Sequence, residues 1–182
     1  MRFRTFLAGC LGGLLSLNSC TNSPDMTDYA AYVNPFIGTG GHGHTFPGAI
    51  LPHGMISPSP DTRIDGWDAC SGYYYADSTI NGFSHTHLSG TGCCDYGDVL
   101  LMPTVGEQKY LPTGSQSQKM AYASSFSHQN ETAEPGYYSV FLDTYQVKAE
   151  LTATKRAAIH RYTFPESREA GFILDFDYSL QR

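Results

Sequence analysis

The segment YQVKAELTAT, residues 145–154, alternates strictly between apolar and polar side chains. In an extended chain its apolar residues share one face: Tyr145, Val147, Ala149, Leu151 and Ala153. The residues between them are polar, so a period of two runs through the whole segment. This pattern predicts an antiparallel strand with one face in a core and the other toward solvent.

Further strand-like segments surround this one at short spacing. They cover residues 96–104, 136–144, 156–165 and 172–177, and no segment of the chain shows sustained helical periodicity. Four or more such strands favour a β-sandwich or a large antiparallel sheet. Residues 28–91 are instead dense in Gly and Pro, which indicates long loops, and loops of that length are usually functional or packed on another element.

The N-terminus is typical of an export signal. Arg2 and Arg4 precede an uncharged apolar stretch, residues 5–17, which is too short to span a bilayer. The next residues, Leu-Asn-Ser-Cys, end at Cys20 and are similar to a bacterial lipobox. This pattern predicts a lipoprotein signal over residues 1–19 and a tether over residues 20–27. It also predicts a lipid-anchored protein of the cell envelope, in the periplasm, the outer membrane or at the cell surface. The alternative is a plain secretory signal with an incidental cysteine.

The charge of the chain argues against one class of partner, and its cysteine count limits the possible disulfides. The formal net charge is −6 and there is no run of Lys or Arg, which argues against nucleic acid as a partner. Past Cys20, three cysteines remain, Cys70, Cys93 and Cys94. An odd number leaves at least one free thiol, and a bridge from Cys70 to Cys93 or Cys94 is an open alternative.

Four ordered strings then carry a resemblance to a known family. They are VNPFIGTGGHGHTFPGAILPHGMISPSPDT, DGWDACSGYYYADSTINGFSHTHLSGTG, DYGDVLLMPT and PGYYSVFLDTYQVKAELTATKRAAIHRYTFP. Over residues 33–177 the chain resembles the N-terminal domain of glycoside hydrolase family 92, the secreted bacterial exo-α-mannosidases.

The resemblance implies a mainly β fold, an antiparallel β-sandwich of the galactose-mutarotase-like supersandwich type, left incomplete here. It also implies a following helical (α/α)-barrel, a calcium-dependent reaction that inverts the anomeric centre, and α-mannosides, with α-1,2 linkages favoured, as substrates. The general acid, the general base and the Ca²⁺ ligands are expected in the helical domain. We therefore expect residues 28–182 to be the N-terminal portion of a mannosidase that is inactive alone.

Two short motifs supply candidate sugar-binding residues. Trp67, the only tryptophan, stands in a loop beside Asp68, and an aromatic face with a neighbouring carboxylate suits a pyranose. The resemblance implies that a tryptophan of this domain faces the sugar, and we carry that role to Trp67. Asp61 and Arg63 form a second candidate, in which Arg63 binds a sugar hydroxyl or orients Asp61. The alternatives are a tryptophan that fills the sandwich edge and an ion pair that stabilises a turn.

The loop GFSHTHLSGTGCCDYGD, residues 82–98, is the third candidate. His85 and His87 would share a face if the segment is extended, and with Cys93 or Cys94 they could imitate zinc ligands, but the spacing matches no standard zinc motif. We expect no metal ligands here. The loop is interpreted as an interface loop in which the histidines either contact the sugar or the helical domain, or make buried hydrogen bonds. With the glycine-rich loop 38–44 it is expected to form a wall beside the sugar or the domain interface, and the alternative is a surface turn.

Three hypotheses follow. The chain is the substrate-pocket domain of an exo-α-mannosidase that acts on mannose-containing glycans with a helical partner domain. Alternatively it is a stand-alone carbohydrate-binding lipoprotein, or an incomplete sandwich that does not fold. A serine hydrolase is disfavoured because no Gly-x-Ser-x-Gly motif is present.

Overall fold

The computed structural model describes residues 27–108 and 120–180. The predicted signal, the lipidation site Cys20 and nearly all of the tether lie outside these residues. Within them the regular elements are ten β-strands and three short 3₁₀ turns, η1 (Tyr29–Tyr32), η2 (Trp67–Ala69) and η3 (His128–Asn130). No helix in this part of the chain is long and apolar enough to cross a membrane.

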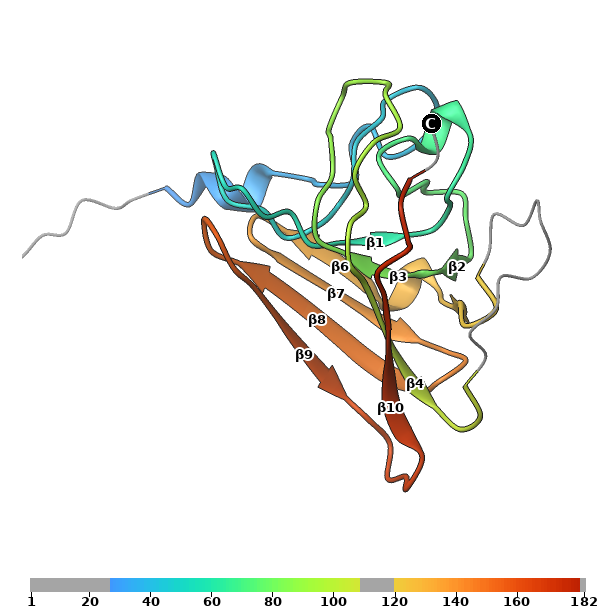
Figure 1. Ribbon diagram of the computed structural model, residues 1–182. Coiled ribbons are helices and arrows are strands. Elements are labelled where there is room, and N and C mark those ends of the chain that lie inside the picture. Colours follow the sequence, from blue (N-terminus) through green and yellow to red (C-terminus); the bar gives the residue numbers. More distant parts are fainter. Residues whose placement is uncertain (1–26, 109–119, 181–182) are drawn as a thin grey trace, which may run out of the picture.

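Two four-stranded antiparallel sheets form the sandwich (Figure 1). The first has the order β1-β3-β4-β10, with β1 (Ser59–Asp61), β3 (Gly82–Ser84), β4 (Leu100–Val105) and β10 (Ala170–Asp175). The second is the meander β6-β7-β8-β9, with β6 (Glu131–Glu134), β7 (Tyr137–Leu142), β8 (Val147–Ala153) and β9 (Ala158–Thr163). A small ladder joins β2 (Thr79–Ile80) to β5 (Ser124–Ser125). The mainly β sandwich expected from the sequence is confirmed.

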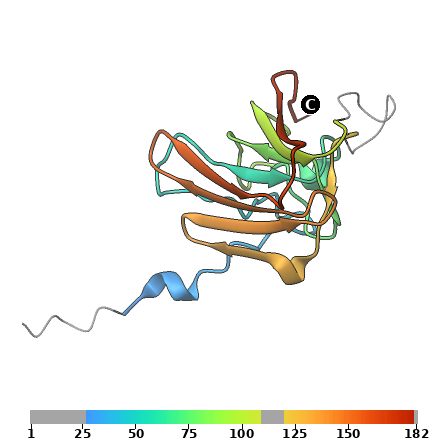
Figure 2. The same ribbon diagram turned by 90° about the horizontal axis from the view of Figure 1, so that it is seen from below.

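The core lies between the two sheets, as the view from below shows (Figure 2). The alternating segment is β8, and four of its five apolar side chains are buried: Val147, Ala149, Leu151 and Ala153. Ala149 and Leu151 pack in one cluster with buried residues of both sheets, among them Phe83, Leu100, Met102, Tyr138, Val140, Leu142 and Ile173. Tyr145 precedes the strand and only packs against this core from its edge.

Strand boundaries differ from the predicted ones where the backbone turns. The strand predicted from residue 96 begins at Leu100, because Tyr96 and Val99 adopt positive φ angles of 69° and 57° that an extended strand does not allow. Gln146, also at positive φ, lies in the turn between β7 and β8, so β8 begins at Val147. The last strand begins at Ala170 instead of residue 172, since its pairing with β4 extends to Val105.

The glycine-rich region keeps its predicted loop character but contributes three short strands. Each of β1, β2 and β3 has only two or three residues, and their partners are distant in sequence. The loops around them gather at one end of the sandwich, near the C-terminal end of the described chain (Figure 1). There the Leu180 N–H donates to the Tyr96 carbonyl at 2.9 Å, which ties the last residues to the loop before β4.

Candidate functional site

Trp67 opens the tight turn η2 and is largely exposed. Gly66, at φ 91°, reverses the chain before it, and the next residue but one, Ala69, is buried and anchors the turn. The indole is 57% exposed, although its Nε1–H donates to the Gly92 carbonyl at 3.0 Å. One edge of the ring is therefore fixed while much of its surface remains available to a ligand.

Two histidines and a carboxylate surround this ring. His44 packs edge-on against Trp67 with a centroid separation of 4.2 Å, and His42 lies tilted at 5.3 Å. His42 Nδ1 is 2.5 Å from Asp68 Oδ1, and both side chains are accessible to solvent. We call Trp67, Asp68, His42 and His44 the Trp67 platform. A flat apolar ring beside a carboxylate and an imidazole suits the C–H face and the hydroxyls of a sugar.

Two glycine-rich loops hold the platform from behind. The Gly90 N–H donates to the His44 carbonyl at 2.6 Å, so the segments 38–45 and 88–92 lie against each other. Gly43 has to be glycine, because a Cβ there would approach the Gly38 backbone to 2.2 Å. The sequence predicted these loops as a wall beside the sugar, and the structure brings both of them to Trp67.

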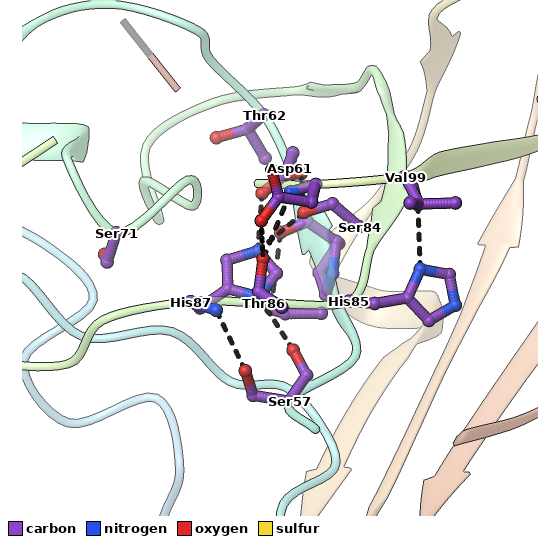
Figure 3. A network of polar contacts seen from close by, with 12 residues as sticks. Ser57, Asp61, Thr62, Ser71, Ser84, His85, Thr86, His87 and Val99 are labelled. Carbon is purple, nitrogen blue, oxygen red and sulfur yellow. Dashed lines mark hydrogen bonds and ion pairs between the residues drawn. The ribbon is translucent and has the colours of Figure 1, made fainter. Parts of the chain in front are cut away.

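Asp61 and His87 lie together in the interior (Figure 3). Both side chains are fully buried, and His87 Nε2 is 2.8 Å from Asp61 Oδ1. Ser84 Oγ donates to the other carboxylate oxygen, and His87 Nδ1 donates to the Ser57 carbonyl at 2.7 Å. These contacts use the polar atoms of Asp61 and both ring nitrogens of His87, so the pair ties β1 to the loop after β3 and is out of reach of a sugar.

Arg63 does not orient Asp61. Its guanidinium binds Asp77 in a fork, with Nε at 2.7 and 2.9 Å from the two oxygens and the terminal nitrogen at 2.6 Å from Oδ1. The hydrogen bond to Asp77 raises the pKa of Arg63, and the guanidinium also covers the Tyr74 ring at 4.5 Å. The predicted alternative in which Arg63 pairs with Asp61 is therefore wrong, because the guanidinium is paired with Asp77 instead.

His85 and His87 have separate surroundings instead of a shared face. His85 Nδ1 donates to the Val99 carbonyl at 2.7 Å, and its ring stacks on His160 with 4.8 Å between centroids. In Figure 3 the His85 ring lies beside Val99, and His87 lies in the cluster with Asp61 and Ser84. In the described ranges no three or more His, Cys, Asp or Glu side chains come together as a group that could hold a metal ion.

Sequence reasoning missed His42 and His44 as parts of the site. The signal was present, because two histidines alternate with glycines in GTGGHGHT, but only the structure shows that this loop meets Trp67 some twenty-five residues later. Of the predicted site residues, Trp67 and Asp68 lie together at the surface. Asp61 and His87 lie together inside, and Arg63 and His85 each have other partners.

Comparisons with known proteins identify the family of the chain. Residues 32–182 match the Glycosyl hydrolase family 92 N-terminal domain. A family 92 α-mannosidase of Bacteroides thetaiotaomicron, solved in complex with mannoimidazole, is 47% identical with a TM-score of 0.78, over 83% of this chain and 20% of that one. An inverting family 92 mannosidase from the same organism is 34% identical with a TM-score of 0.66, over 80% of this chain and 19% of that one.

A relative from Arthroderma benhamiae, described as an uncharacterized secreted glycosidase, is 34% identical over 77% of this chain and 18% of its own length. The chain thus spans about a fifth of the length of the relatives that it matches. The match to the family extends from Tyr32 to the last residue and includes every strand of the sandwich. The chain belongs to glycoside hydrolase family 92 and corresponds to the N-terminal domain of its α-mannosidases.

Proposed function

We propose that this chain provides the substrate-facing wall of an exo-α-mannosidase that hydrolyses terminal α-mannosides, α-1,2 linkages in particular, with inversion. The observation that carries the proposal is the Trp67 platform, an exposed indole held by Gly92 and flanked by Asp68 and His42. Family membership and the names of the solved relatives support the substrate class.

On this platform the chain's own residues bind and orient the sugar. The indole packs against the C–H face of a pyranose, and the exposed carboxylate of Asp68 accepts a hydroxyl hydrogen bond. His42 holds Asp68 in place through its 2.5 Å contact, and the His42 side chain is itself largely exposed. Such positioning of a substrate supports a reaction that other groups carry out.

The catalytic carboxyl groups are proposed to lie in a helical partner domain. Inversion needs two carboxyl groups about 6.5–9.5 Å apart with room for water between them. Asp68 contacts the His42 ring of the platform, and Asp61 is buried on His87. We therefore propose that the chain alone is inactive.

Calcium is also assigned to the partner domain. Ca²⁺ takes six to eight oxygen ligands. The described part of the chain does not gather three or more acidic, histidine or cysteine side chains at one point, so its residues do not fit such a site. No step of the proposed sugar binding runs through the ion.

The test is kinetic and uses this chain fused to a family 92 helical domain. Replacing Trp67 by Ala is expected to lower kcat/KM on an α-1,2-mannobiose by about 10- to 100-fold, equivalent to about 1.4–2.7 kcal/mol. Tyr29→Ala, at an exposed aromatic of η1 outside the platform, is the matched control and is expected to leave kcat/KM unchanged. Equal kinetics for Trp67→Ala and the unmodified fusion would refute the assignment.

A second candidate, a carbohydrate-binding lipoprotein without catalysis, is favoured by one observation. The chain by itself exposes the Trp67 ring and, beside it in sequence, the Asp68 carboxylate. Binding of α-mannosides by the chain alone, read from Trp67 fluorescence and unaffected by a helical domain, would favour this function over the first.

We also propose that lipidation of Cys20 anchors the protein in a bacterial cell envelope. The relative named as a secreted glycosidase supports export, and the lipobox-like sequence before Cys20 supports the anchor. Incorporation of a labelled fatty acid that is lost in Cys20→Ala, followed in a bacterial host, tests the anchor. Label that persists in the variant would exclude it.

A further inference from the structure

Two cysteines lie at opposite ends of the turn that carries Trp67. Cys70 ends η2, with its N–H donating to the Trp67 carbonyl at 3.2 Å, and it is only 2% exposed. Cys94 comes from the loop before β4, and its thiol points at the carbonyl of Gly66, the residue that begins the turn, at 4.0 Å. The same loop accepts the indole hydrogen bond at Gly92.

The two thiols also interact directly. Burial, followed by the charge of Cys94 and a hydrogen bond with it, raises the pKa of Cys70 to about 11. Burial raises the pKa of Cys94 as well, while its hydrogen bond with Cys70 works in the opposite direction. Cys93, Cys94 and Cys70 are all free thiols in the structure, and Cys93 is the exposed one of the three.

We propose that Cys70 and Cys94 form a disulfide under oxidising conditions, and that this bond fastens the Trp67 turn to the loop 92–94. A disulfide needs its Cα atoms within about 4.4–6.8 Å and its sulfurs facing each other. The Cys94 sulfur lies 4.0 Å from the Gly66 carbonyl oxygen, which also accepts the Ala69 N–H at 3.1 Å, so this sulfur lies against the turn that Cys70 closes. Neighbouring Cys93 is exposed, whereas Cys94 is partly buried.

The oxidant is a small disulfide such as oxidised glutathione. The Cys94 thiolate, the more accessible of the pair, attacks one glutathione sulfur, which forms a mixed disulfide and releases one glutathione thiolate. Cys70 then loses its proton and attacks the Cys94 sulfur, which forms the internal disulfide and releases the second glutathione. Two protein thiols are oxidised and one glutathione disulfide is reduced to two thiols.

His44 is placed to assist the second step. Its Nδ1 is 3.1 Å from the Cys70 sulfur, and its Nε2 is buried without a hydrogen-bond partner. The ring can accept the Cys70 proton at Nδ1 when it carries its own proton on Nε2. This contact offsets the high pKa of Cys70, which would otherwise keep that thiol unreactive near neutral pH.

The disulfide would affect the proposed sugar-binding surface. Trp67 stands between the two ends that the bond would join, so oxidation would restrict the motion of its turn. Closing the loop from residue 70 to 94 is also expected to raise the melting temperature by roughly 5–10 °C. Because Trp67 is the only tryptophan, its fluorescence reports on this turn alone.

The test is peptide mapping of the full chain after incubation with oxidised glutathione under native conditions. The expected product is a Cys70–Cys94 linked peptide, with the intact mass lower by two hydrogens and Cys93 still open to maleimide. The linked peptide and the rise in melting temperature are expected to disappear with dithiothreitol. A Cys93–Cys94 or Cys70–Cys93 linkage, or maleimide labelling of Cys94 that persists after oxidation, would overturn the proposal.

Two variants separate the proposed bond from general thiol oxidation. Cys93→Ser is expected to keep the linked peptide and the oxidation-dependent change in Trp67 fluorescence, whereas Cys94→Ser is expected to lose both. Native far-UV circular dichroism of Cys94→Ser establishes that the loss is not unfolding. A fluorescence change of equal size in both variants would show that the exposed Cys93 or another thiol is responsible.

Discussion

The carboxylate of Glu131 joins three side chains from separate parts of the sandwich, and its removal gives the most quantitative prediction. Glu131 begins β6 and accepts hydrogen bonds from Tyr73 at 3.0 and 3.1 Å, from Tyr138 at 2.6 Å, and from His128 at 2.6 Å. Tyr73 comes from the loops of the first sheet, and Tyr138 from β7 in the second. Burial, reinforced by the Glu131 charge, raises the pKa of Tyr73 and of Tyr138, so both hydroxyls remain protonated donors.

The expected losses follow from what each change leaves behind. Tyr73→Phe removes one hydrogen bond to a charged acceptor and is expected to lower the free energy of unfolding by about 1.5–3 kcal/mol. Glu131→Ala instead leaves the buried hydroxyls of Tyr73 and Tyr138 without an acceptor, at about 1–3 kcal/mol each, for a loss of about 2–6 kcal/mol. The larger effect is therefore expected from removing the acceptor.

The assay is urea unfolding at pH 7, followed by far-UV circular dichroism. Tyr137→Phe is the matched control, since Tyr137 is adjacent to Tyr138 and donates to Glu150 at 2.8 Å, but on the outer, partly exposed face of the same strand. Its expected loss is below about 1 kcal/mol. If Tyr73→Phe costs no more than Tyr137→Phe, the buried network does not hold the two halves together as argued here.

Two further predictions concern acid stability and a packed glycine. The hydrogen bond from Arg161 lowers the pKa of Glu150 to about 2 from 4.5, so this carboxylate contributes stability above pH 4.5 that is lost as the pH falls toward 2. Thermal melts between pH 5 and 2 should show a steeper decline for the unmodified chain than for Glu150→Gln, and parallel curves would contradict the pairing. Gly72→Ala is expected to destabilise the chain by about 1–3 kcal/mol more than Gly66→Ala. The two glycines have nearly equal φ angles, 92° and 91°, so the backbone strain is matched. A Cβ at position 72 would lie 2.1 Å from Asp61 Oδ1, whereas a Cβ at position 66 has no neighbouring atom within 4 Å. Equal melting temperatures for the two variants would mean that the buried carboxylate moves aside freely.

The second half of the chain was predictable because its strands carry a local signal. The alternation in residues 145–154 gives the buried face of β8 directly, and β7 and β9 are its neighbours in both sequence and space. Short hairpin connections make such pairings independent of the rest of the fold. Two boundaries failed where a non-glycine residue, Tyr96 or Gln146, adopts positive φ, and the start of β10 failed because its pairing with β4 extends to Val105.

The first half of the chain was less predictable because its strands pair with segments that are distant in sequence and because some of its polar side chains are buried. Asp61 pairs with His87 at a separation of 26 residues, and nothing in the sequence marks either side chain as buried. The same holds for the site, where Trp67 was identifiable as a lone tryptophan in a loop. His42 and His44 became part of the site only through long-range contacts that a sequence pattern does not show.

The measurement that tests the central proposal most directly is α-mannosidase activity on an α-1,2-mannobiose, with calcium and then with EDTA. The chain is assayed alone and fused to a family 92 helical domain, beside that helical domain without the chain. We predict activity in the fusion only, and its loss with EDTA. Activity of the chain alone would contradict the proposal and would place a catalytic carboxyl pair among its own acidic residues. A helical domain that is equally active without the chain would show that the Trp67 platform is not part of the pocket.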